Sequence, residues 1–155
     1  MTRMTTGFRV EFDQANRISL MRVEGRLTDE SLPYLYEASR KYSSATNARV
    51  SIVDLSSVSE FAVSSQSIQN LAHQKPASKH CCFIVAPEGL AFGLCRMFQI
   101  LGEVTRPLLH IVHTLVEVFE AIGIRSPHFV EPSIGPVLSA LNKTGTIMAE
   151  QVAAR

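Results

Sequence analysis

The strongest constraint on the fold is a run of six apolar residues at positions 81–86 (CCFIVA), which ends at the turn-forming Pro87-Glu88-Gly89. A strand that is apolar at every position is expected to be covered on both faces. Strands of this kind lie in sheets that carry helices on their two sides. The run therefore predicts the centre of an α/β fold.

Hydrophobic patterning places the other elements around this run. Further strands are expected at residues 8–12, 18–24, 49–55 and 108–113, and the first two read as a hairpin across a turn at 13–16. Helices are expected from about residue 28, from Ser64 or Ser65, over 90–103 and after Thr114. The order β-β-α-β-α-β-α-β-α predicts a mostly parallel sheet with one antiparallel strand from the hairpin.

Polar residues at the expected helix starts support these boundaries. Residues 28–31 (TDES) offer caps and first-turn acids for the first helix. Thr114 and Glu117 form a capping box for the last helix, and Gly123 is a suitable C-terminal stop. Ser64 is an N-cap candidate for the second helix, a role that is worth about 1 kcal/mol.

The third helix carries two stripes of side chains. Its expected core stripe consists of Leu90, Leu94, Met97, Phe98 and Leu101. A second stripe, spaced i, i+4, i+7, i+11, consists of Phe92, Arg96, Gln99 and Glu103. A helix this apolar is usually covered on more than one side, here by the tail, a second copy of the chain or a ligand. Arg96 is a candidate anchor for a carboxylate; the alternative is surface pairing with a nearby Glu.

Composition and length bound the organisation of the chain. Its 155 residues suit one domain, expected at 8–124 after a flexible N-terminus at 1–7. The tail at 125–155 contains prolines, with a short helix expected at 134–141 and a disordered end after it. No apolar run approaches the roughly 20 residues of a membrane span, and the start lacks the apolar region of a signal peptide. Three cysteines without CxxC spacing indicate a reducing compartment, so we expect a cytoplasmic protein.

Several functional classes lack support in the sequence. A formal net charge of +1 and the absence of Trp argue against nucleic acid or an acidic membrane as a partner. His110 and His113 lie on opposite faces of an expected strand, so they cannot chelate one metal ion. Neither a G-x-S-x-G elbow nor a glycine-rich phosphate loop is present. We therefore expect no metal, no cofactor and no enzymatic activity.

Four motifs in the right order resemble the STAS domain (sulfate transporter and anti-sigma-factor antagonist). Residues 23–28 (VEGRLT) are similar to the family's G-x-L start of its first helix, and 53–58 (VDLSSV) to its D-L-S-x-V strand end. Residues 114–119 (TLVEVF) are similar to its closing T-L-x-E-A-L helix. Residues 85–98 are more similar to a branch of small stand-alone bacterial STAS-like proteins. The resemblance covers 8–124 and leaves out the tail.

The resemblance implies a non-enzymatic interaction module in bacterial signalling that binds another protein. In antagonist members, a serine in the pattern D-S-[ST]-G at the start of the second helix is phosphorylated. Ser64 matches that serine, but Val63 replaces the Asp and Gln66 the Gly, and the stretch lies one residue late. These departures put phosphorylation control in doubt, and Ser64 as a plain N-cap is the favoured interpretation.

Two further possibilities stay open at this stage. The over-apolar third helix favours a carrier or sensor of a small apolar or acidic ligand, with an apolar pocket near that helix and Arg96 at the head group. The same helix and the tail also favour a homodimer with an isologous interface.

Overall fold

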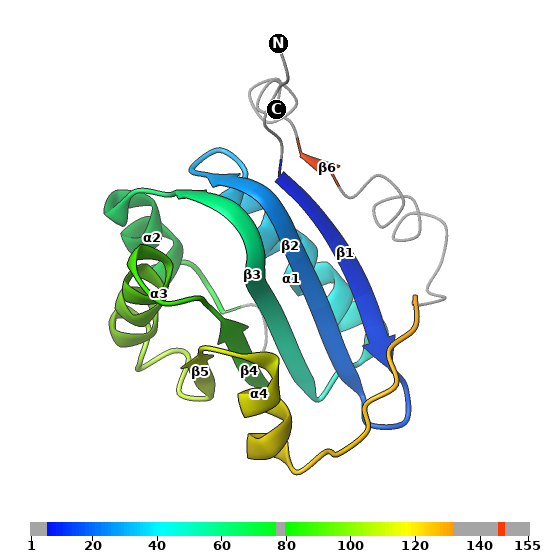
Figure 1. Ribbon diagram of the computed structural model, residues 1–155. Helices are drawn as coiled ribbons and strands as arrows, with labels where there is room; N and C mark the ends of the chain where they lie inside the picture. Colours follow the sequence, from blue (N-terminus) through cyan, green and yellow to red (C-terminus); the bar gives the residue numbers. More distant parts are fainter. Residues whose placement is uncertain (1–5, 77–79, 132–145, 148–155) are drawn as a thin grey trace.

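The computed structural model of the chain describes residues 6–76, 80–131 and 146–147. The strands are β1 (Thr6–Asp13), β2 (Ile18–Thr28), β3 (Val50–Ala62), β4 (Cys81–Val85), β5 (Leu109–Val112) and β6 (Thr146–Ile147). The helices are α1 (Leu32–Thr46), α2 (Ser65–Ala72), α3 (Leu90–Leu101) and α4 (Leu115–Ile122). Up to α4, the predicted element order is confirmed (Figure 1).

One mixed sheet organises these elements, in the strand order β5-β4-β3-β2-β1-β6. The pairs β2–β3, β3–β4 and β4–β5 are parallel, whereas β1 runs antiparallel to both β2 and β6. The predicted parallel sheet with an antiparallel strand from the N-terminal hairpin is therefore confirmed, and β6 adds a second antiparallel pair.

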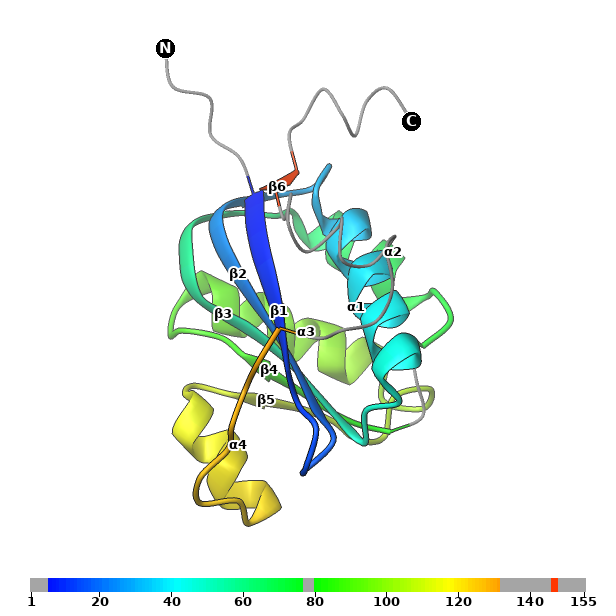
Figure 2. The same ribbon diagram turned by 90° about the vertical axis from the view of Figure 1, so that its right-hand side faces the viewer.

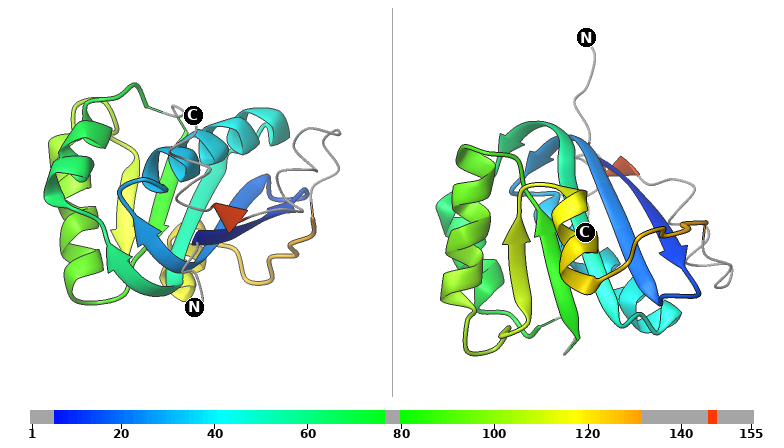
Figure 3. Two further views of the ribbon diagram at one scale, coloured as in Figure 1. Left: turned by 90° about the horizontal axis from the view of Figure 1, so that it is seen from above. Right: turned by 60° about the horizontal axis from the view of Figure 1, so that its bottom comes forward.

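Helices cover both faces of the sheet. On one face, α1, α2 and α3 pack against β-strand side chains such as Val23 and Leu55. On the other face, α4 and the segment that follows it pack against Leu20, Ile52 and Phe83. Figure 2 and the right panel of Figure 3 show α4 on the side of the sheet opposite α1. Alternate β4 side chains therefore enter two different cores, which is why residues 81–86 contain no polar position.

The core face of α3 differs from the predicted one. Its buried side chains are Ala91, Leu94, Cys95 and Phe98. Leu90 is 64% exposed and Leu101 is 48% exposed, so both ends of the predicted stripe were wrong. These four residues are spaced i, i+3, i+4, i+7 and therefore form one face of the helix, which packs against the sheet. Leu90 lies outside this face.

Strand β3 is longer than expected and runs to Ala62 instead of ending at residue 55. Its serine-rich stretch at 56–59 hides the strand periodicity, but β2 also continues and pairs with β3 as far as Thr28. An ion pair between Arg26 Nε and Glu60 Oε2 at 3.0 Å bridges the two strands near this end. Cross-strand pairing, which local patterning does not reveal, extends the strand.

Two segments from the C-terminal part of the chain lie along β1. Phe12 and Val130 exchange two backbone hydrogen bonds, of 2.7 and 3.0 Å, so the segment after α4 returns to this strand. β6, within the stretch where a disordered end was expected, pairs with Thr6 and Gly7. β1 itself begins two residues before the expected start of the domain. The short helix expected at 134–141 lies outside the described residues.

Candidate functional site

The start of α2 is built around the exposed Ser64. Its backbone is extended (φ −84°, ψ 157°), and its hydroxyl oxygen accepts a hydrogen bond of 3.2 Å from the backbone N–H of Ser67. Ser64 is therefore the N-cap of α2, as its sequence position predicts. Ser65 and Gln66, in the first turn, are also exposed, so the helix start forms an accessible polar surface.

Asp29 completes this helix start from the loop between β2 and α1. Its Oδ1 accepts a hydrogen bond of 2.8 Å from the backbone N–H of Ser64. Burial raises the pKa of Asp29, but hydrogen bonds from the Ser64 N–H and from the side chains of Ser67 and Ser64 outweigh that effect and leave the pKa below its ordinary value. The carboxylate thus stays ionised at the positive end of the helix dipole.

This position of Asp29 corrects one expectation. Residues 28–31 were expected to cap α1, yet the N-cap of that helix, Ser31, makes no capping hydrogen bond with its side chain. Ser31 Oγ instead joins a network with Thr6 and Thr28. Asp29 therefore supplies the second helix with an acidic residue beside Ser64, where Val63 has taken the place of the Asp in the family pattern.

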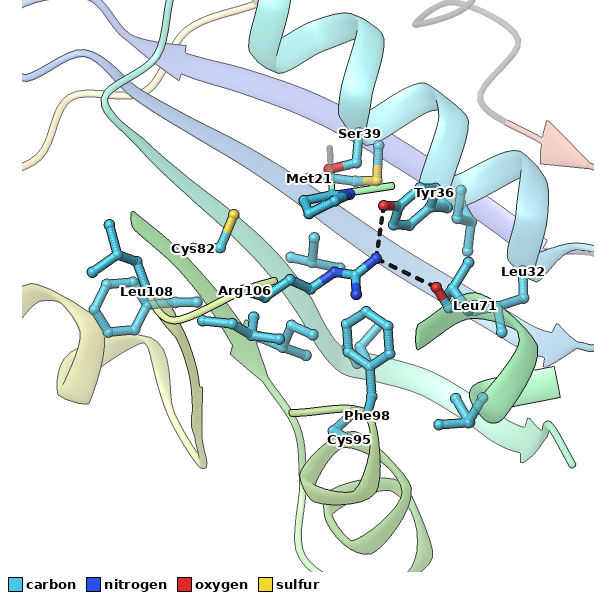
Figure 4. A pocket seen from close by; sticks show the side chains of 18 of the residues that line it. Met21, Leu32, Tyr36, Ser39, Leu71, Cys82, Cys95, Phe98, Arg106 and Leu108 are labelled. Atoms are coloured by element: carbon cyan, nitrogen blue, oxygen red, sulfur yellow. Dashed lines mark hydrogen bonds between the residues drawn. The ribbon is translucent and has the colours of Figure 1, made fainter. Parts of the chain in front are cut away.

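A cavity of about 440 Å³ lies between the sheet and the three helices on its α1–α3 face. Its lining is almost entirely apolar and includes Met21, Leu35, Val53, Leu71, Cys95 and Phe98 (Figure 4). Burial raises the pKa of the Cys95 thiol to about 12, so this cysteine stays protonated.

The cavity is large for a domain of this size. Core cavities destabilise proteins by about 24 cal/mol per Å³. For 440 Å³ the product is about 11 kcal/mol, which is an upper limit because the cavity is partly open. Net stabilities of domains are about 5–15 kcal/mol, so an empty cavity would be comparable with the whole stability of the fold.

Arg106, from the loop between α3 and β5, extends into this cavity between Tyr36 and Phe98 (Figure 4). Its guanidinium donates to the backbone carbonyls of Ala72 (2.9 Å) and Gln74 (2.8 Å) and to the Tyr36 hydroxyl (3.1 Å). It also lies over the Phe98 ring, 4.8 Å from the centroid. A cation at the C-terminal carbonyls of α2 is favourably placed in the helix dipole.

The predicted second stripe of α3 lies beside this cavity but does not line it. Phe92 stacks on His113 (4.1 Å between centroids), and the Gln99 amide donates to the Leu109 carbonyl at 2.8 Å. Arg96 is exposed and donates to the Gln99 side chain, and Glu103 is exposed beyond the end of the helix. A ligand role for this stripe stays a prediction, and the guanidinium at the apolar cavity belongs to Arg106.

His110 lies in β5 and His113 directly after it, and the two side chains contact residues of different cores. His110 contacts Phe83, at 5.1 Å between ring centroids, whereas His113 contacts Phe92. Within the described residues, no group of three or more His, Cys, Asp or Glu side chains is arranged to hold a metal ion. The helices of that same part of the chain include none that is long and apolar enough to cross a membrane.

Sequence signals for the cavity were weak. Arg106 lies in a connection rather than in a periodic element, and its acceptors lie more than 30 positions earlier in the chain.

Ile100, Leu101 and Val104 are exposed near the end of α3. Self-association through this surface stays a prediction.

Comparison with solved structures identifies a similar fold. An anti-sigma factor antagonist from Mycobacterium paratuberculosis matches with a TM-score of 0.52 and 24% sequence identity, over 76% of this chain and 94% of that chain. No protein-family model and no curated protein matches the sequence. Together with the order of strands and helices, the match shows that the chain has the STAS-like α/β fold that its motifs predict.

Proposed function

We propose that the chain is a non-enzymatic, STAS-like module that binds another protein in bacterial signalling, and that the start of α2 is part of its binding surface. The observation that carries this proposal is the fold shared with an anti-sigma factor antagonist. The exposed positions Ser64, Ser65 and Gln66 at the helix start support the choice of surface.

Phosphorylation of Ser64 is the regulation we propose for this surface. A phosphate adds about 1.5–2 negative charges and would occupy the same positive helix end as the Asp29 carboxylate. In the unmodified protein, the Ser64 N–H donates to Asp29 and the Ser67 N–H donates to the Ser64 hydroxyl oxygen. The phosphate and the Asp29 carboxylate would compete for these two N–H groups. Phosphorylation would therefore release Asp29 and change the loop between β2 and α1.

Site-specific photocrosslinking tests the binding surface. A photoreactive amino acid replaces Gln66 at the start of α2, and a control replaces Glu120, which is exposed on α4 on the opposite face of the sheet. Both proteins are expressed in the native host and irradiated. We expect a defined crosslinked partner from position 66 and none from position 120.

The same experiment includes a phosphomimetic arm. Ser64→Asp in the position-66 protein is expected to weaken or abolish the crosslink, whereas Ser64→Ala retains it. Equal crosslinking at positions 66 and 120, or none at position 66, would count against the surface. An unchanged crosslink with Ser64→Asp would remove only the regulatory part of the proposal.

A further inference from the structure

We infer that the cavity between the sheet and α1–α3 is a binding site for a single-chain aliphatic carboxylate, with the carboxylate at Arg106. This inference rests on the cavity and not on the proposed partner surface, because Ser64 and Gln66 do not line the cavity. It adds a ligand to a module whose proposed function is protein binding.

The size and lining of the cavity define the apolar part of the ligand. Ligand sites commonly measure about 300–1,000 Å³, and this one measures about 440 Å³. An apolar cavity of about 150 Å³ holds one benzene molecule, so this volume corresponds to roughly three such rings, or about 18 non-hydrogen atoms. A straight chain of medium length fits that estimate, since the lining provides few polar groups.

Water is a poor occupant of this cavity. A buried water needs two to four polar partners, whereas the lining consists mostly of aliphatic and aromatic side chains. Its polar side chains include His80, whose pKa is lowered by burial, and Tyr36. The hydroxyl of Tyr36 is already bonded to Lys75 and Arg106. An apolar chain therefore fits most of the cavity better than solvent does.

Arg106 defines the head group. Among the described residues of the lining it is the one permanently charged side chain, and none of them is Asp or Glu. All its protein acceptors among the described residues are neutral carbonyl or hydroxyl oxygens, and its Nε–H has no acceptor there. A guanidinium in apolar surroundings binds a carboxylate more strongly than a neutral group. A ligand carboxylate at Nε would supply the missing counter-charge.

Wild-type binding of size-matched head groups is the first test. The full chain is stripped of bound lipid, and dodecanoate, 1-dodecanol and dodecylamine are titrated by calorimetry below their aggregation concentrations. We expect one dodecanoate per chain, bound about ten- to hundredfold more tightly than the alcohol, as a hydrogen bond to a charged group predicts. The amine should bind more weakly still, because its charge repels Arg106.

Two pairs of matched variants locate the site. Val53→Phe fills the cavity and should abolish dodecanoate binding, whereas Val116→Phe, at an exposed position of α4, should leave it unchanged. Arg106→Met should lower dodecanoate affinity to that of the alcohol. Arg125→Met, at an exposed position outside the lining, should bind like the wild type.

Each alternative result would overturn a defined part of the inference. No saturable binding of dodecanoate, or unchanged binding by Val53→Phe, would remove the cavity as its site. Equal affinities for dodecanoate and dodecanol in the wild type would remove the carboxylate preference. If Arg106→Met does not fold, the inference is still tested by two results. These are the relative affinities of the wild type for the three ligands, and the comparison of Val53→Phe with Val116→Phe.

Discussion

Removing the Arg106 guanidinium tests the packing that holds α2 against the α3–β5 loop. The Arg106→Met variant keeps a long apolar side chain over Phe98 but deletes every donor to the end of α2. The carbonyls of Ala72 and Gln74 then lose hydrogen bonds of 2.9 and 2.8 Å. We expect the ligand-free protein to be destabilised, because nothing in the substituted side chain can replace these donors.

The expected magnitude follows from the contacts. A hydrogen bond from a charged group contributes about 1.5–3 kcal/mol, and the stacking of a cation on an aromatic ring about 0.5–1 kcal/mol. Water can reach the half-buried site and recovers part of the loss. We therefore expect a loss of about 2–4 kcal/mol, which lowers the Tm of a domain of this size by about 4–16 °C.

Urea unfolding of lipid-stripped protein measures this loss. The matched control is Arg96→Met, which removes an exposed guanidinium bonded to the Gln99 side chain. Exposed substitutions of this kind change stability by less than about 0.5 kcal/mol. Equal unfolding free energies for the Arg106 and Arg96 variants would refute the assigned capping role.

The remaining stability predictions concern local contacts, each measured by urea unfolding. Thr114→Val should cost about 1 kcal/mol, because the hydroxyl caps α4 by accepting from the Glu117 N–H; a loss near zero would contradict that role. Gly123→Ala should cost about 1–2 kcal/mol, since φ is +73°, and an unchanged stability would contradict the strain. Burial raises the pKa of Asp13, but hydrogen bonds that include those from Asn16 and the His128 N–H hold it below 3.8. Asp13 therefore stabilises the fold above about pH 4 and stops doing so as pH falls through the lowered pKa. Asp13→Asn should be less stable than the wild type by about 1–3 kcal/mol at pH 7, and the difference should shrink near pH 2; a difference independent of pH would contradict this account.

Local sequence patterns predicted the fold well where the determinants were local. The apolar run at 81–86 revealed a strand covered on both faces, and Ser64, Thr114 and Gly123 marked helix ends that the structure confirms. These signals depend on neighbours within one or two turns. For that reason the element order and the sheet type followed from the sequence.

Features set by distant contacts were not predictable in the same way. Asp29 accepts a hydrogen bond from the N–H of Ser64, which lies 35 positions later in the chain. The sequence shows Asp29 only next to the start of α1, so it predicts a cap for α1 instead of α2. Sequence periodicity identifies the apolar residues around the cavity as buried. It does not show whether the side chains of facing elements are in contact or leave a cavity between them. Helical periodicity identifies a face that includes Arg96, whereas Arg106 lies in a loop without any such periodicity.

The most direct test of the central claim is the affinity of the crosslinked partner for variants at the start of α2. Wild type and Ser64→Ala are compared with Ser64→Asp, and Glu120→Ala on the opposite face serves as the control. We predict equal affinities for wild type, Ser64→Ala and Glu120→Ala, and at least tenfold weaker binding of Ser64→Asp. Loss of affinity in Glu120→Ala together with unchanged binding of Ser64→Asp would contradict the claim that the protein acts through this surface.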